Sequence, residues 1–116
     1  VHDSETVSAL FRFLDGPLRD GKLDYDGIFC NTDWLAVRIL RHLEERGVDV
    51  PGQVQIIGFD GVVDYATGRC GCSTIEQPLA QMAETAADLL LHPSSTSAGA
   101  TICLPVRYVP GDTTRG

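Results

Sequence analysis

The sequence has few basic residues. Nine lysines and arginines face sixteen aspartates and glutamates, which gives the 116-residue chain a formal net charge of −7. A surface this acidic repels the phosphate backbone of nucleic acids, so we expect no specific DNA binding by this chain itself. The length corresponds to one domain or part of one, and a hydrophobic content of 43% allows a modest core.

Long apolar runs and export signals are also missing. No stretch approaches the roughly 18 apolar residues of a membrane span, and no signal-peptide pattern opens the chain. Val1 and His2 look like the end of a segment that continues upstream. These features predict a cytoplasmic protein without a membrane partner.

Signatures of common enzyme classes are absent. The chain has no glycine-rich phosphate loop, no GxSxG motif and no HExxH motif. His2, His42 and His92 are scattered, and the last two stand at positions typical of structural histidines. Because we find neither a nucleophile–base pair nor a metal cluster, we predict that the chain is not an enzyme.

The four cysteines do not form a recognisable metal motif. Cys30 and Cys103 lie in strand-like runs and are expected to be buried. Cys70 and Cys72 are too close for an easy disulfide and lack a second pair at zinc spacing. Reduced thiols are the preferred interpretation and metal binding is the alternative, so no cofactor and no metal site is predicted.

Hydrophobic patterning predicts alternating helices and strands. Helices are expected at 4–14, 33–46 and 78–91, and strands at 26–30, 53–60, 73–75, 101–104 and 106–109. Asp33 is expected to cap the second helix, and the tail from Gly111 is expected to be frayed. This order predicts an α/β fold with a mainly parallel sheet flanked by helices.

The run from Gln53 to Asp60 is the centre of this pattern. It is apolar, contains the β-branched residues Val54, Ile56 and Ile57, and indicates a strand buried on both faces of a parallel sheet. Ligands collect outside the carboxyl ends of such strands, where Asp60 stands. Two interpretations remain open: Asp60 accepts hydrogen bonds from a ligand, or it only caps a turn.

Four segments carry a resemblance to a known family. They are residues 29–36 (FCNTDWLA), 47–60 (GVDVPGQVQIIGFD), 73–78 (STIEQP) and 104–109 (LPVRYV). In this order they resemble the C-x-x-D-x-x-A segment, the VP-to-GFD stretch, the QP hinge segment and the closing LP strand of the lactose/galactose repressor family of bacterial transcription regulators. The resemblance covers nearly the whole chain.

The resemblance implies a periplasmic-binding-protein-like (type I) fold, in which two α/β subdomains enclose an effector cleft. Residues 1–75 and 104–116 would belong to the C-terminal subdomain. Residues 76–103 would form a crossing segment and a helix that packs on an N-terminal subdomain. That subdomain and a helix-turn-helix would lie upstream, so the protein would reach DNA only through them.

The resemblance also implies site residues. Asp60 matches the family carboxylate that binds the effector, and Gln77 matches a polar hinge position near it. Thr32 stands where many members have a ligand-binding asparagine, while Asn31 comes one place earlier. The expected effector is a small polar molecule, such as a sugar or nucleoside-like compound. Gly61 replaces a second family aspartate, which weakens any argument for a particular sugar.

A homodimer is implied in the same way. The family's dimer surface corresponds to Val37, Val62, Val63 and Tyr65. The alternative to a regulator is the solute-binding protein of a transporter, which shares the fold. The cysteines, which are expected to be unpaired, and the amino-acid sequence of the VP-to-GFD stretch favour the regulator.

The third predicted helix carries an apolar stripe without an assigned partner in this chain. The stripe consists of Leu79, Met82, Ala83, Ala86 and Leu90. Leaving it in water costs roughly 25 cal/mol for each Å² of apolar area. We therefore expect it to be covered by a second copy, or by folding back on its own sheet.

Overall fold

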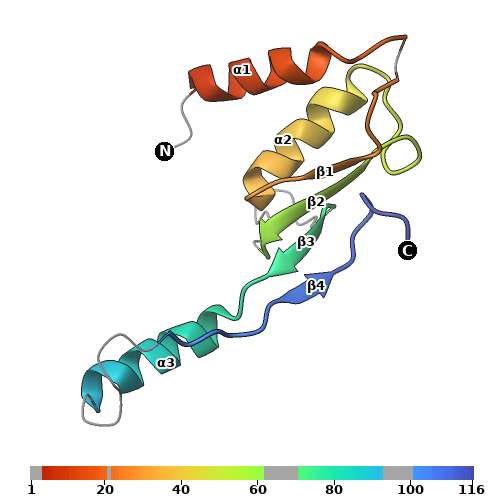
Figure 1. Ribbon diagram of the computed structural model, residues 1–116. Coiled ribbons are helices and arrows are strands. Elements are labelled where there is room, and N and C mark those ends of the chain that lie inside the picture. Colours follow the sequence, from red (N-terminus) through yellow and green to blue (C-terminus); the bar gives the residue numbers. More distant parts are fainter. Residues whose placement is uncertain (1–3, 21, 62–70, 93–100) are drawn as a thin grey trace.

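The computed structural model describes residues 4–20, 22–61, 71–92 and 101–116. Its elements, in chain order, are α1 (Ser4–Asp15), β1 (Gly27–Phe29), α2 (Asp33–Glu44), β2 (Gln55–Asp60), β3 (Ser73–Glu76), α3 (Leu79–Leu91) and β4 (Arg107–Val109) (Figure 1). Val62, Val63 and Tyr65, which the resemblance assigns to a dimer surface, lie outside the described residues.

The four strands form one sheet in the order β1-β2-β3-β4. The first three are parallel, with Phe29 paired to Ile57 and Asp60 paired to Glu76, and β4 is antiparallel to β3. The predicted mainly parallel α/β fold is therefore confirmed. The predicted strand at 101–104 is wrong, because this segment returns beside α3 and reaches the sheet only at β4 (Figure 1).

The core lies between α2 and one face of the sheet. On β2 and the residue before it, Val54, Ile56 and Gly58 are buried on the face that packs against α2. Ile57 and Phe59, whose side chains point to the other face of β2, are only half-buried among the described residues. The prediction that β2 is buried on both faces is therefore correct for one face only. The buried apolar cluster comprises Leu14, Cys30, Ala36, Ile39, Leu43, Val48, Val54, Ile56 and Cys72.

A polar joint holds α1 against the end of α2. The Asp15 Oδ1 atom lies 2.8 Å from His42 Nε2 and 2.6 Å from Arg46 Nε. The His42 ring is buried and stacks on Phe11 with 4.0 Å between the ring centroids. His42 therefore has a structural role in this joint.

The C-terminal tail is ordered against the sheet, contrary to the prediction that it frays. Thr113 is 2% exposed. Its backbone carbonyl accepts a hydrogen bond from the Ile56 N–H, and its hydroxyl both donates to the Ile56 carbonyl at 2.6 Å and accepts from the Ser73 N–H at 2.9 Å. We call residues 111–115 the strap, because they tie β2 to the start of β3.

The helix α3 projects away from the sheet as an arm (Figure 1). None of its residues is buried, and Leu79 and Leu90 are 59% and 82% exposed. The chain has a radius of gyration of 18.1 Å, compared with about 13 Å for a compact domain of this length. The expectation that α3 might fold back on its own sheet is therefore wrong for this structure.

The burial of the cysteines agrees with the prediction for Cys30 but not for Cys103. Cys30 and Cys72 are buried, whereas Cys103 is exposed because the segment that holds it is not a strand. Burial, with Cys72 and Asp33 nearby, raises the pKa of Cys30 to about 11. The Cys30 thiol is therefore protonated at neutral pH and behaves as a core side chain.

The described residues hold neither a metal-binding cluster nor a helix that could span a membrane. In the ranges given above, no group of three or more His, Cys, Asp or Glu side chains is arranged to hold a metal ion. Within the same ranges, every helix is too short or too polar to cross a membrane.

Candidate functional site

The carboxyl ends of β1, β2 and β3 meet at one edge of the sheet. Asn31 and Thr32 follow β1, Asp60 ends β2, and Gln77 follows β3. The strand register places Asp60 beside Glu76, directly before Gln77. The four residues predicted from the family resemblance therefore share the edge where open α/β sheets bind ligands.

Asp60 and Gln77 are in direct contact. Gln77 Nε2 donates a hydrogen bond to Asp60 Oδ1 at 2.6 Å, and the Gln77 backbone N–H donates to the Asp60 carbonyl at 3.3 Å. Both residues are half-buried. Asp60 also has a φ of 113°, a region that non-glycine residues rarely adopt. Backbone strain of this kind is concentrated at functional sites.

Thr32, rather than Asp33, caps α2. The Thr32 Oγ1 atom accepts a hydrogen bond from the Leu35 N–H at 3.2 Å. The prediction that Asp33 caps this helix is wrong by one residue, because both residue types can cap and pattern alone does not separate them. The Thr32 hydroxyl still has its proton to donate.

The carboxylate of Asp33 has a different role. It accepts a hydrogen bond of 2.5 Å from the Thr74 hydroxyl, and both side chains are buried. This contact joins the first turn of α2 to β3 across β2. The Thr74 hydroxyl oxygen also accepts a hydrogen bond from the Gly61 N–H at 3.3 Å. The sequence analysis missed this cluster, which positions the residue after Asp60.

Gly58 makes room for the same cluster. A Cβ atom at Gly58 would lie 2.2 Å from Asp33 Oδ1 and 3.3 Å from Ala36 Cβ. A glycine inside a strand-like run can mark such a close approach. That signal was present in the sequence and could have indicated that α2 begins directly over β2.

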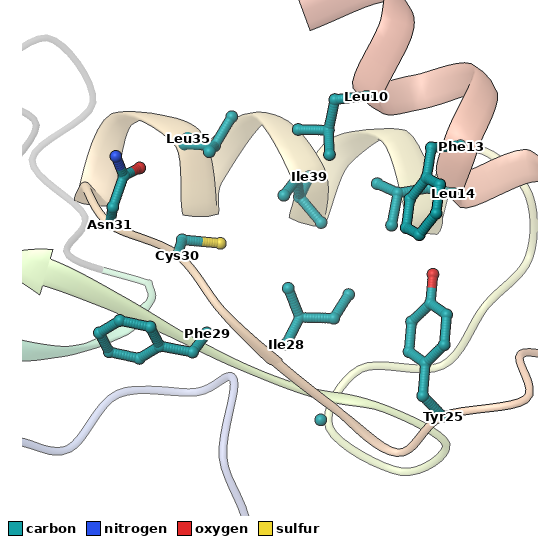
Figure 2. Close-up of a pocket in the computed structure, with 11 residues that line it drawn as sticks. Leu10, Phe13, Leu14, Tyr25, Ile28, Phe29, Cys30, Asn31, Leu35 and Ile39 are labelled. Carbon is teal, nitrogen blue, oxygen red and sulfur yellow. The ribbon is translucent and has the colours of Figure 1, made fainter.

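An open cavity of about 440 Å³ lies beside β1. Side chains of α1, β1 and α2 surround it (Figure 2). Of the four predicted site residues, only Asn31 lines it. Leu10, Phe13, Tyr25, Ile28 and Leu35 also contribute, and its surface is mostly apolar. This cavity is therefore separate from the pair formed by Asp60 and Gln77.

Trp34 lies at the first turn of α2, close to this edge. Its side chain is 42% exposed, and the Arg38 guanidinium carbon lies 4.6 Å from its ring centroid. One face of the indole is thus covered by a cation from its own helix.

Comparison with known proteins identifies the fold family. A family model described as a periplasmic binding protein-like domain matches residues 4–114. The chain belongs to this family. The predicted resemblance to lactose/galactose repressor-type regulators is confirmed by relatives that are named as repressors.

Two of these relatives are operon repressors. The sucrose operon repressor of Pediococcus pentosaceus is 32% identical over 77% of this chain, and the ribose operon repressor of Bacillus subtilis is 36% identical over 78%. The chain spans 28% of the length of each. It therefore corresponds to a part of these regulators.

Solved structures agree with the fold. A LacI family transcriptional regulator from Enterococcus faecium with bound ribose superposes with a TM-score of 0.67 at 27% identity. The match covers 95% of this chain and 40% of that one. In this chain the same fold has Asp60 and Gln77 at the carboxyl edge of the parallel strands.

Proposed function

We propose that this chain is the effector-sensing part of a bacterial transcription regulator. The observation that carries this proposal is the Asp60–Gln77 pair at the carboxyl edge of the parallel strands. The relatives named after sucrose and ribose support a sugar-like effector. Asn31 and Thr32, at the end of the neighbouring strand, complete the proposed site.

The rest of the regulator would make the other side of the effector cleft. Residues 1–75 and 104–116 would form one subdomain, and residues 76–103 would pack on a second subdomain. The exposed α3 supports this division, because none of its apolar side chains is buried among the described residues. DNA binding would come from a helix-turn-helix outside this chain, and the protein would act in the cytoplasm, not as an enzyme.

A homodimer is part of the proposal. Val37 is half-buried and packs against the core, so only part of its side chain is available to a partner. Val62, Val63 and Tyr65 complete the proposed dimer surface on the strength of the family resemblance alone.

A transporter's solute-binding protein shares this fold and is the alternative function. The named repressors among the relatives favour the regulator. The two functions differ in DNA binding. In a gel-shift assay, only a full-length regulator would bind an operator fragment, and the effector would weaken or strengthen that binding. The 116-residue chain alone should show no sequence-specific retention, because of its net charge of −7.

The decisive experiment is calorimetric titration of the full-length protein that contains this chain, with D-ribose and sucrose as probes. Asp60→Ala should weaken binding of the active sugar by about 1.5–3 kcal/mol, the scale of hydrogen bonds to a charged group. Operator binding without sugar should stay unchanged. Equal sugar affinity in the wild type and the variant would remove Asp60 from the site.

A further inference from the structure

Helix capping does not account for the buried carboxylate of Asp33. This residue opens α2 and is 7% exposed, but the cap itself is Thr32. A carboxylate is costly to bury unless it is hydrogen-bonded. Gly58 leaves the space that the carboxylate fills, since a Cβ atom there would lie 2.2 Å from Asp33 Oδ1. The charge at this place therefore calls for a role other than starting the helix.

The Asp33 carboxylate fixes the direction of the Thr74 hydroxyl. Thr74 is 1% exposed, and its hydroxyl has one proton to donate. That proton goes to Asp33 Oδ1 at 2.5 Å, and the hydroxyl oxygen then accepts a hydrogen bond from the Gly61 N–H at 3.3 Å. We call these two bonds between Asp33, Thr74 and Gly61 the relay. The relay connects the first turn of α2, through β3, to the residue that follows β2.

The relay ends on a turn with an unusual backbone. Asp60 and Gly61 have φ angles of 113° and 75°, and a residue other than glycine rarely adopts such an angle. A Cβ atom at Gly61 would lie 2.8 Å from Glu76 Cα, so this turn lies directly against β3. A strained conformation persists only where its surroundings over-determine it. The bond from the Gly61 N–H to Thr74 is one of the contacts that hold the turn.

We propose that Asp33 is a positioning residue for the effector site. Through the Thr74 hydroxyl it holds the Asp60–Gly61 turn, and it thereby sets the direction of the Asp60 carboxylate. Without an acceptor for its proton, the Thr74 hydroxyl can rotate away from the Gly61 N–H, and the turn can relax toward ordinary backbone angles. This inference rests on the proposed function and adds to it a buried residue of α2 that acts without touching the ligand.

Two matched valine substitutions test the proposal in the full-length protein, with D-ribose and sucrose as calorimetric probes. Thr74→Val keeps the shape of the side chain but removes the relay hydroxyl, and should weaken binding of the active sugar on the order of tenfold. Thr113→Val also removes a buried hydroxyl, but that hydroxyl contacts Ile56 and Ser73. It should leave the sugar affinity unchanged. An equal loss in both variants would mean that affinity follows stability alone, and would overturn the proposal.

A conservative substitution tests Asp33 itself. Asp33→Ala removes the acceptor and should weaken sugar binding as much as Thr74→Val does. Asp33→Asn keeps an acceptor oxygen for the hydroxyl and should recover most of the affinity. The double variant of Asp33→Ala and Thr74→Val should bind no more weakly than either single variant, because both substitutions break the same relay. Wild-type affinity in Asp33→Ala, or additive losses in the double variant, would overturn the proposal.

A further measurement needs no ligand. In the NMR spectrum of the full-length protein with isotope-labelled glycine, the Gly61 amide proton should exchange slowly with solvent. Thr74→Val and Asp33→Ala should abolish that protection, and Asp33→Asn should keep it. Fast exchange in the wild type would overturn the role of the relay even if sugars bind. Protection that depends on Asp33 in a protein that binds neither sugar would instead remove the proposed function and leave the hold on the turn intact.

Discussion

Gly58 lets the first turn of α2 lie directly on β2. Gly58→Ala would place a methyl group 2.2 Å from Asp33 Oδ1 and 3.1 Å from the Asp33 backbone, so the helix would have to move. We expect a loss of about 1–3 kcal/mol in the free energy of unfolding, typical of overpacking. Urea denaturation followed by circular dichroism measures it.

Gly27→Ala is the matched control for this substitution. It lies in β1, and a Cβ atom there would meet nothing within 4 Å. Its stability should therefore stay the same or rise slightly, because alanine restricts the unfolded chain. An equal loss in both variants would show that the close approach at Gly58 does not matter.

At the scale of single residues, sequence reasoning left two roles open for Asp60, and only the family resemblance put Gln77 near it. The structure brings the two side chains into contact. Sequence reasoning worked less well elsewhere. It failed for Thr32 and Asp33, because both can cap a helix and the choice depends on the burial of Asp33 against Thr74.

The joint between α1 and α2 depends on the charge of Asp15. Burial disfavours the charged form, but hydrogen bonds and attraction from His42 and Arg46 outweigh it and hold the pKa of Asp15 below its ordinary value of 3.8. A carboxyl whose pKa is lowered in the folded state contributes stability above its unfolded pKa. This contribution disappears as the pH falls through the folded pKa.

Asp15→Asn should therefore lower the stability near pH 7 and have little effect at pH values well below 3.8. The Asp15 side chain is 37% exposed, so solvent screening limits the loss to less than about 1 kcal/mol. Thermal unfolding across pH 2.5–7 measures the difference. A constant gap between the two proteins at every pH would rule out a role for the charge.

The strap ties two strands through one hydroxyl. Thr113→Val keeps the shape of the side chain but leaves the Ser73 N–H and the Ile56 carbonyl without this partner in a buried place. We expect a loss of about 1–3 kcal/mol, the cost of unsatisfied buried polar groups.

Chemical denaturation of the Thr113→Val protein measures this loss. Thr101→Val is the control, because Thr101 is exposed and its substitution should change stability by less than about 0.5 kcal/mol. Comparable stability of wild type and Thr113→Val would mean that water replaces the strap hydroxyl without cost.

At the scale of elements, hydrophobic patterning located the helices and the sheet strands of the described residues, because each has an apolar pattern, although α3 buries none of its residues in this structure. The strap escaped detection, since its contacts are made by a threonine hydroxyl and backbone groups, which leave no hydrophobic pattern. Residues 101–104 were predicted to be a strand because their composition is typical of strands. In the structure they have no neighbouring strand to pair with, so they do not form one.

The whole molecule exposes an apolar arm. Leu79, Met82 and Leu90 are 59%, 42% and 82% exposed, and such a surface is favourable to bury. We expect the isolated chain to self-associate through α3 at tens of micromolar, as measured by sedimentation velocity. The variants Met82→Lys and Leu90→Lys should shift it to a monomer.

Lysine is chosen because the chain carries a net charge of −7, so the added positive charge does not increase repulsion between copies. Gln81→Lys, on the opposite side of the same helix, is the control and should leave association unchanged. A wild-type chain that is monomeric with α3 exposed would show that this arm needs no partner.

The strands on either side of the arm, β3 before α3 and β4 after it, are neighbours in the sheet. Glu76 and Arg107 face each other in the β3–β4 register and form an ion pair. An antiparallel pair of this kind needs only two turn residues to connect it. A protein engineer could therefore excise residues 77–106 and join β3 to β4 through an Asn-Gly hairpin. This minimal scaffold would keep the sheet, both core helices and the strap, and it would lose the protruding apolar surface.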